Sequence, residues 1–251
     1  MGLAVAFFVT ALLYASVGFG GGSTYSALLA LSNVDFRVLP AIALLCNIVV
    51  VTGGTIRYSR AGLVPWRRVL PLACVSAPFA WLGGLTPIKE TTFLLILALS
   101  LIVAGLALLF QKETQELPIE PTRTRKDRGF DILTGVSIGY FAGLVGIGGG
   151  IFLAPYLHLT RWAGSRAIAA TASVFILINS ISGLAGQMMK LTATGNLPVL
   201  TSYWPLAFAV LVGGQIGSVI GVQLLSPLFV RRATAFLIMF VAGQLFWKLL
   251  G

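Results

Sequence analysis

Two glycine clusters are the residues in this sequence whose types and spacing most clearly allow chemistry. Both read Val-Gly-x-Gly-Gly-Gly, at residues 17–22 and 145–150. Glycine destabilises a helix interior by up to about 1 kcal/mol per residue, so each cluster should end one helix and let another begin. The first N–H groups of a helix lack partners within it and lie at the positive end of its dipole, which makes them an anion site. The glycines expected to line such a site are Gly20, Gly21, Gly22, Gly148, Gly149 and Gly150.

The residues that follow the two clusters differ. Ser23 and Thr24 follow the first cluster and can cap the new helix or donate to an oxyanion,. Ile151 and Phe152 occupy the same places after the second cluster. The two halves of the site should therefore not bind an anion identically.

A further set of polar residues lies inside apolar segments. In lipid such groups face the protein interior, where they either contact a substrate or hydrogen-bond neighbouring helices. Asn47 and Asn179 lie 29 and 33 residues beyond the first glycine of their clusters, a recurrence that favours a shared role. The candidates for substrate contact are Asn47, Thr171, Ser173, Asn179, Gln187 and Gln215.

Composition excludes several classes of protein. Of the 251 residues, 57% are hydrophobic and only 10% are charged, against about 25% charged in soluble domains,. This excludes a soluble enzyme, a disordered chain and a nucleic-acid binder, despite the net charge of +10. All seven acidic residues fall in loops or at the ends of apolar segments, and there is one histidine. We therefore expect no enzyme activity, no metal and no cofactor, and a cation carrier is disfavoured.

The charge-free intervals indicate the elements that must position these residues. A membrane-spanning helix needs about 20 apolar residues. Six intervals fit one crossing each: 38–56, 69–88, 91–111, 167–189, 199–225 and 233–250. Two intervals, 1–34 and 132–160, are too long for one crossing, and each contains a glycine cluster. We expect each of these to be a helical hairpin whose bend lies deep in the membrane, with the two hairpins meeting near the midplane.

The clusters lie 128 residues apart, which indicates an internal duplication,. The first repeat is expected over 1–111, with a hairpin at 3–32 and three spans, and the second over 129–251, with a hairpin at 132–160 and three spans. The linker 112–128 holds most of the acidic residues and should be a solvated loop. Five segments per repeat is an odd number, so the repeats should be inverted relative to each other. Inverted repeats with broken helices are typical of secondary transporters, whose substrate sites lie near the midplane.

The distribution of Lys and Arg predicts the orientation. If each glycine interval returns to the side it entered from, 13 of the 17 Lys and Arg lie on the side of the linker. If each interval crosses once instead, the split is 11 to 6. The first arrangement is preferred, with the linker cytoplasmic and both termini outside. The lipid bilayer is then the main partner, and nothing in the sequence indicates an oligomeric state.

These motifs resemble the TauE/SafE sulfite exporter family (TSUP transporters). The resemblance rests on the paired clusters Gly18-Phe19-Gly20-Gly21-Gly22 and Gly146-Ile147-Gly148-Gly149-Gly150. It also rests on the stretch from Arg166 to Gly183, and on Leu45-Cys46-Asn47 followed by the turn at Arg57 and Arg60. It covers nearly the whole chain and implies a multi-pass carrier of the cell inner membrane that moves sulfite or small organosulfonates, often as an exporter.

We therefore predict an all-α polytopic membrane protein that transports a small anion by alternating access. An anion channel would use the same site without alternating conformations. A membrane scaffold or subunit without transport activity is the third possibility.

Overall fold

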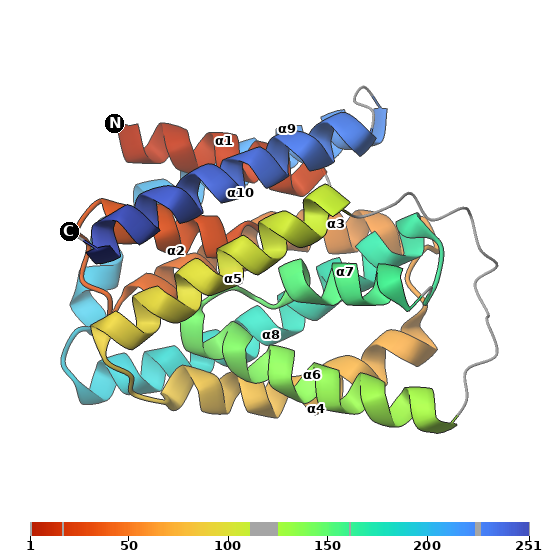
Figure 1. Cartoon of the computed structure of the whole chain (residues 1–251), viewed down its shortest axis with the longest axis horizontal. Helices are drawn as coiled ribbons and strands as arrows, with labels where there is room; N and C mark the ends of the chain where they lie inside the picture. Colours follow the sequence, from red (N-terminus) through yellow and green to blue (C-terminus); the bar gives the residue numbers. More distant parts are fainter. Residues whose placement is uncertain (1, 17, 111–124, 161, 224–226, 251) are drawn as a thin grey trace.

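The computed structural model describes residues 2–16, 18–110, 125–160, 162–223 and 227–250 (Figure 1). Within these ranges the chain contains helices and no strand. The helices of the first half are α1 (Gly2–Ser16), α2 (Gly22–Leu31), α3 (Leu39–Arg60), α4 (Trp66–Leu85) and α5 (Glu90–Phe110). Those of the second half are α6 (Arg125–Val145), α7 (Gly150–Leu159), α8 (Ser165–Ala193), the 3₁₀ helix η1 (Leu197–Tyr203), α9 (Trp204–Gln223) and α10 (Pro227–Leu250).

Within the described part of the chain, five helical segments are long and apolar enough to cross a membrane. They are α3, α4, α5, α8, and the run Leu197–Val219 formed by η1 and most of α9. The sixth expected span, 233–250, lies within α10. These segments confirm the prediction of an all-α polytopic membrane protein.

The charged residues that bound the expected spans predict the helix ends only approximately. Lys190 lies inside α8, which continues to Ala193 before Gly195 adopts a φ of +72°. In the other direction, α6 begins at Arg125, so the last four residues of the expected linker 112–128 are helical. The rest of that linker, to residue 124, lies outside the described residues. A single charged side chain near a helix end does not break the helix, because it can extend towards the interface.

Each glycine cluster separates a long helix from a short one. α1 is followed by the ten-residue α2, and α6 by the ten-residue α7. Ten residues of helix measure about 15 Å, half the thickness of the hydrocarbon core. In Figure 1, α2 lies in the left half of the molecule and α7 in the right half. The two short helices thus occupy opposite halves of its length.

The packing of the helices repeats between the halves of the chain. α1 packs along α9 as α6 packs along α4, while α3 contacts α8 and α5 contacts α10 (Figure 1). At the α1–α9 contact, a Cβ on Gly213 or Gly217 would overlap the backbone carbonyls of Phe8 and Leu12. Small residues therefore let these helices approach closely. If α1 to α5 are matched in order to α6 to α10, the α1–α9 contact corresponds to the α6–α4 contact. The α3–α8 and α5–α10 contacts each correspond to themselves. The inverted orientation of the repeats stays a prediction.

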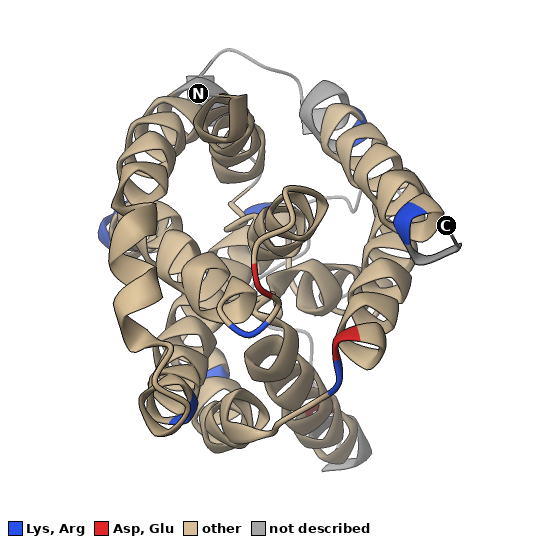
Figure 2. Cartoon of the chain, turned by 90° about the vertical axis from the view of Figure 1, so that its left-hand side faces the viewer, with Lys and Arg blue, Asp and Glu red and all other residues tan. Residues whose placement is uncertain are grey.

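Both chain ends lie at the same end of the molecule (Figure 1), and α5 ends and α6 begins at the opposite end. Figure 2 views the end with the termini and shows few basic or acidic positions among the helices. α3 and α8 bury the largest shares of their residues among the candidate spans. These two helices therefore form the centre of the fold, and the short helices that follow the glycine bends pack against them, α2 on α3 and α7 on α8.

Candidate functional site

The first glycine cluster reverses the chain inside the protein. Gly18 and Gly21 have φ values of +86° and +87°, in the left-handed region that favours glycine,. α1 ends before this reversal and α2 begins directly after it, at Gly22. All residues from Gly18 to Ala27 are buried. The N-terminus of α2 therefore lies in the interior rather than at a surface.

The second cluster does the same between α6 and α7. Gly146, Gly148 and Gly149 have φ values of +80°, +76° and +83°. The residues from Ala142 to Ile151 are all buried, so the N-terminus of α7 is also internal. Both helices thus break at the expected glycines.

The two bends contact each other. Ser26 Oγ in α2 donates a hydrogen bond to the carbonyl of Val145 at 3.2 Å. A Cβ on Gly22 would lie 2.6 Å from the carbonyl oxygen of Gly146, closer than real Cβ atoms approach. Only glycine at position 22 therefore allows this contact. Segments far apart in the sequence meet here as one unit.

Asn47 of α3 lies between the two bends and is fully buried. Its Nδ2 donates to the carbonyl of Ile147 at 3.2 Å, while its Oδ1 has no hydrogen-bond partner among the described residues. A Cβ on Gly20 or Gly22 would overlap the Asn47 amide, and one on Gly148 would lie 2.7 Å from Nδ2. The Asn47 amide thus touches both glycine clusters.

Several hydrogen-bond donors at the start of α2 are available. The first backbone bond of this helix runs from the Tyr25 N–H to the Gly21 carbonyl at 3.0 Å. No described residue accepts a hydrogen bond from the N–H groups of residues 20–24. Ser23 Oγ is buried without a partner, whereas Thr24 Oγ1 is bonded to the Tyr14 hydroxyl at 2.6 Å. The free N–H groups and the Ser23 hydroxyl can therefore bind an anion.

Ser180 of α8 supplies a second unpaired hydroxyl. Its Oγ is fully buried, has no partner in the described chain, and lies 2.9 Å from the position of a Cβ on Gly148. A buried hydroxyl without a hydrogen bond costs about 1–3 kcal/mol. Three such hydroxyls lie beside the glycine bends, those of Ser23, Ser180 and Tyr25, the last 3.1 Å from the position of a Cβ on Gly21. A polar ligand can satisfy hydroxyls of this kind.

The surroundings of the bends carry no described acidic side chain. Asp35 and Glu90 line one cavity together with Lys248, which lies in the last turn of α10. Asp131 lies in the outer part of α6, where its Oδ1 accepts a hydrogen bond from the Tyr156 hydroxyl at 2.7 Å. Among the described residues no three His, Cys, Asp or Glu side chains gather as a metal site. The site is thus electropositive through backbone dipoles alone, which suits an anion.

Two of the expected site residues bond within or between the central helices. Thr171 Oγ1 donates to the carbonyl of Ala167 in its own helix at 2.7 Å. Ser173 Oγ lies 2.9 Å from Thr55 Oγ1, which joins α8 to α3. The structure does not bring these two hydroxyls to the glycine bends through any hydrogen bond.

The remaining expected residues also connect helices. Asn179 Oδ1 accepts a hydrogen bond from Ser76 Oγ of α4 at 2.9 Å. Gln187 Nε2 donates to the carbonyl of Gly143 at 2.8 Å, and Gln215 Oε1 accepts from Arg57 at 3.1 Å. These side chains clamp α8 to α4, α8 to α6, and α3 to α9. Asn179 thus makes the contacts of an inter-helix clamp, and its contact with a substrate stays a prediction.

Asn47 and Asn179 do not occupy matching places. A Cβ on Gly150 would overlap the Ile176 side chain, as one on Gly22 would overlap Asn47. Ile176 lies 30 residues beyond Gly146, close to the 29 that separate Asn47 from Gly18. The apolar Ile176 is thus the counterpart of Asn47, so the second half lacks a matching amide, although the Ser180 hydroxyl lies beside Gly148.

Residues beside the bends that the sequence analysis did not select are Ser180, Tyr14 and Tyr25. Ser180 directly follows Asn179, and its polarity in an apolar helix was the available signal. Tyr14 orients Thr24, and Tyr25 stacks on Phe7 with ring centroids 4.7 Å apart. A buried tyrosine hydroxyl usually has a hydrogen-bond partner. The Tyr25 hydroxyl has none among the described residues, whereas that of Tyr14 is bonded to Thr24.

A membrane protein whose two broken helices meet around unpaired donors belongs, by its architecture, with the membrane transporters. The comparisons with known proteins agree. The sulfite exporter TauE/SafE family matches residues 3–245. The probable membrane transporter protein y4hK of Sinorhizobium fredii is 35% identical over 98% of both chains.

A more distant relative is the probable membrane transporter protein MJ0441 of Methanocaldococcus jannaschii, which is 25% identical over 72% of this chain and 69% of its own. No solved structure matches the chain. The protein belongs to the TauE/SafE sulfite exporter family, and is therefore a member of a family of membrane transporters.

Proposed function

We propose that this protein is a secondary transporter that exports a small sulfur-containing anion, sulfite or an organosulfonate, and binds it at the N-terminus of α2. The observation that carries the proposal is the cluster of unpaired donors at the first glycine bend. The N–H groups of residues 20–24 and the Ser23 hydroxyl lack acceptors among the described residues. An anion would satisfy them together.

The oxygen atoms of a sulfite or sulfonate group suit this geometry. Each such oxygen can accept more than one hydrogen bond, and a compact anion can approach the backbone closely where glycine leaves out a Cβ. The family description names sulfite as the cargo and export as the direction. Both are carried over to this chain as part of the proposal.

Alternating access is supported by the equivalence of the two halves. The contacts of α1 with α9 and of α4 with α6 exchange when the halves are swapped. Two arrangements related by that exchange would open the site to opposite sides in turn. We further propose that the linker 112–128 faces the cytoplasm and that both termini face outward.

The direct test is flux of radiolabelled sulfite into proteoliposomes that contain the purified full-length chain. We expect saturable uptake by the wild type and a strong loss with Asn47→Ala. Asn196→Ala is the matched control, because Asn196 lies in the turn after α8, with its amide bonded to Thr194 at 3.2 Å. That variant should transport as the wild type does.

Folding is checked by size exclusion and by the thermal midpoint. Sulfite at 100 times its dissociation constant should stabilise the wild type by about 2.7 kcal/mol, and Asn47→Ala much less. Counterflow of labelled sulfite against its own gradient distinguishes a carrier from a channel, which does not show it. Saturable flux without counterflow would support the channel. Absence of both binding and flux, for sulfite and for ethanesulfonate, would refute anion transport.

A further inference from the structure

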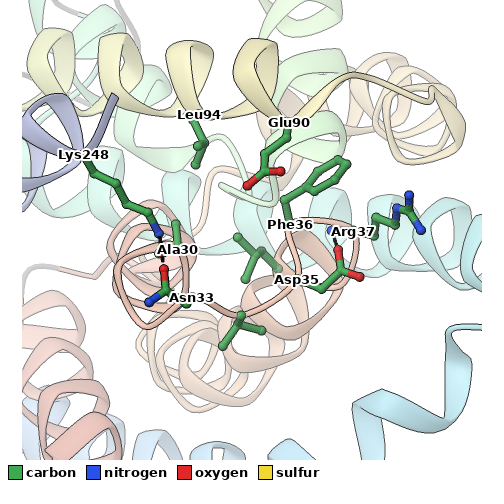
Figure 3. Close-up of a pocket in the computed structure, with 10 residues that line it drawn as sticks. Ala30, Asn33, Asp35, Phe36, Arg37, Glu90, Leu94 and Lys248 are labelled. Carbon is green, nitrogen blue, oxygen red and sulfur yellow. Dashed lines mark hydrogen bonds between the residues drawn. The ribbon is translucent and has the colours of Figure 1, made fainter. Parts of the chain in front are cut away.

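Two cavities lie side by side at the end of the molecule that carries both termini. The first has a volume of about 350 Å³ and is shown in Figure 3. The second has a volume of about 200 Å³. Phe36 and Arg37, in the turn between α2 and α3, line both cavities. The cavities differ in charge.

The larger cavity carries charges of both signs. Its lining includes the carboxylates of Asp35 and Glu90 (Figure 3). Its lysine, Lys248, donates to the carbonyl of Ala30 at 2.5 Å and to Asn33 Oδ1 at 2.7 Å. The Lys248 ammonium group thus binds acceptors at the C-terminal end of α2. An anion entering this cavity would meet two carboxylates, so the larger cavity does not suit an anion.

The smaller cavity has cations and no carboxylate in its lining. Arg37 and Lys190 contribute its charges, from the turn before α3 and from the end of α8. Figure 3 shows the Arg37 side chain turned away from the carboxylates of Asp35 and Glu90. Lys190 is half-buried, and its ammonium group is bonded to the Thr86 carbonyl at 3.5 Å. Both cations are therefore available to an anion.

The floor of the smaller cavity adjoins the second glycine bend. Pro40 and Leu144 line the cavity. A Cβ on Gly146 would lie 2.5 Å from the Cα of Pro40, so Pro40 packs directly on that bend. The next residue, Ile147, holds the Asn47 amide through its carbonyl. Pro40, Gly146 and Ile147 thus connect the cavity to the Asn47 amide of the candidate site.

We propose that the cavity between Arg37 and Lys190 is the outer port of the transport path, where a small anion is held next to the glycine bends. Its volume equals that of several waters at about 30 Å³ each, enough for one small anion. Most of its walls are apolar, which strengthens the attraction of the two cations. These walls also suit an organosulfonate with a short carbon chain. This inference rests on the proposed anion transport and adds the route and two residues.

The test compares Lys190→Gln with Lys190→Arg in proteoliposomes, using ethanesulfonate as the probe on the side of the termini. Loss of the Lys190 charge should raise the half-saturation concentration about tenfold at low ionic strength. The effect should shrink in high salt, and the maximal rate should change little. Lys190→Arg keeps the charge and should stay within about twofold of the wild type.

Lys89→Gln is the matched control, because Lys89 is exposed at the same end and lines neither cavity. Equal effects of Lys89→Gln and Lys190→Gln would show that any surface cation attracts the anion. That result would overturn the proposal that the cavity between Arg37 and Lys190 is a port. An unchanged half-saturation in folded Lys190→Gln would overturn it too, while wild-type flux would still support anion transport. Absence of any flux in the wild type would instead refute the proposed function itself.

Discussion

Replacement of Ser23 by alanine should move stability and substrate affinity in opposite directions. The Ser23 hydroxyl is buried and has no partner among the described residues. Its removal relieves an unpaired polar group and should raise the free energy of unfolding by about 1 kcal/mol. For a protein of this size, that corresponds to a rise of about 2–4 °C in the thermal midpoint.

The same substitution should weaken anion binding. A hydrogen bond to a charged group contributes about 1.5–3 kcal/mol, and each 1.4 kcal/mol is a factor of ten. Ser23→Ala should therefore raise the half-saturation concentration for sulfite by about 10- to 150-fold. The assay is initial uptake against sulfite concentration in proteoliposomes, with thermal midpoints measured on the same preparations.

Ser26→Ala is the control from the same helix. Ser26 Oγ donates to the Val145 carbonyl at 3.2 Å, so its loss should lower the free energy of unfolding by about 1 kcal/mol,. Affinity for sulfite should change little. The reasoning is refuted if Ser23→Ala transports with wild-type affinity, or if it loses as much stability as Ser26→Ala.

Three further substitutions and one control test the assignment of roles. Asn179→Ala removes the bond to Ser76 and should destabilise the protein by about 1–3 kcal/mol, with the half-saturation concentration unchanged; a large change in affinity would place Asn179 at the substrate. Gly149 has a φ of +83°, and a Cβ there would lie 2.8 Å from a neighbouring side chain, so Gly149→Ala should abolish uptake. Gly62 has a φ of +68° but open space around it, so the control Gly62→Ala should lower the free energy of unfolding by only about 1–2 kcal/mol,. Arg57→Gln removes the link from α3 to α9 through Gln215 and should lower the thermal midpoint, and an unchanged midpoint would show that this link contributes nothing.

The helix breaks could be predicted from the sequence because they depend on local properties. An apolar interval too long for one crossing must break, and a glycine cluster within it marks the place because glycine destabilises a helix interior. That the two bends meet was expected from the duplication and from the architecture of transporters with broken helices. The residues in contact could not be derived in this way, because the packing of Gly22 against Gly146 is a long-range contact that local periodicity does not contain.

The pairing of Asn47 with Asn179 shows where sequence recurrence misleads. The spacing of 29 and 33 residues suggests equivalence, but the residue that faces Gly150 is Ile176. Asn179 lies three residues further on, about 4.5 Å along the helix axis. At that level it meets α4 and bonds to Ser76. Shifts smaller than one helical turn decide between a site and a clamp.

The sequence also could not separate partnered from unpartnered hydroxyls. Ser23, Thr24 and Ser26 are neighbours in one short helix and are all buried. Thr24 is held by Tyr14 and Ser26 by the Val145 carbonyl, which leaves Ser23 for a ligand. Those partners come from other segments of the chain, so only the folded arrangement identifies the free donor.

The unequal halves of the site follow from the demands of transport. A carrier must bind its substrate strongly enough to select it and weakly enough to release it on the other side. Equal sets of side-chain donors on both bends would hold one small anion more tightly than release allows. The start of α7 keeps N–H groups without acceptors among the described residues, but Ile151 and Ile176 stand where the first half has Ser23 and Asn47, so the second bend offers fewer side-chain donors. In the proposed transport cycle, this inequality favours recognition of the anion without slowing its release.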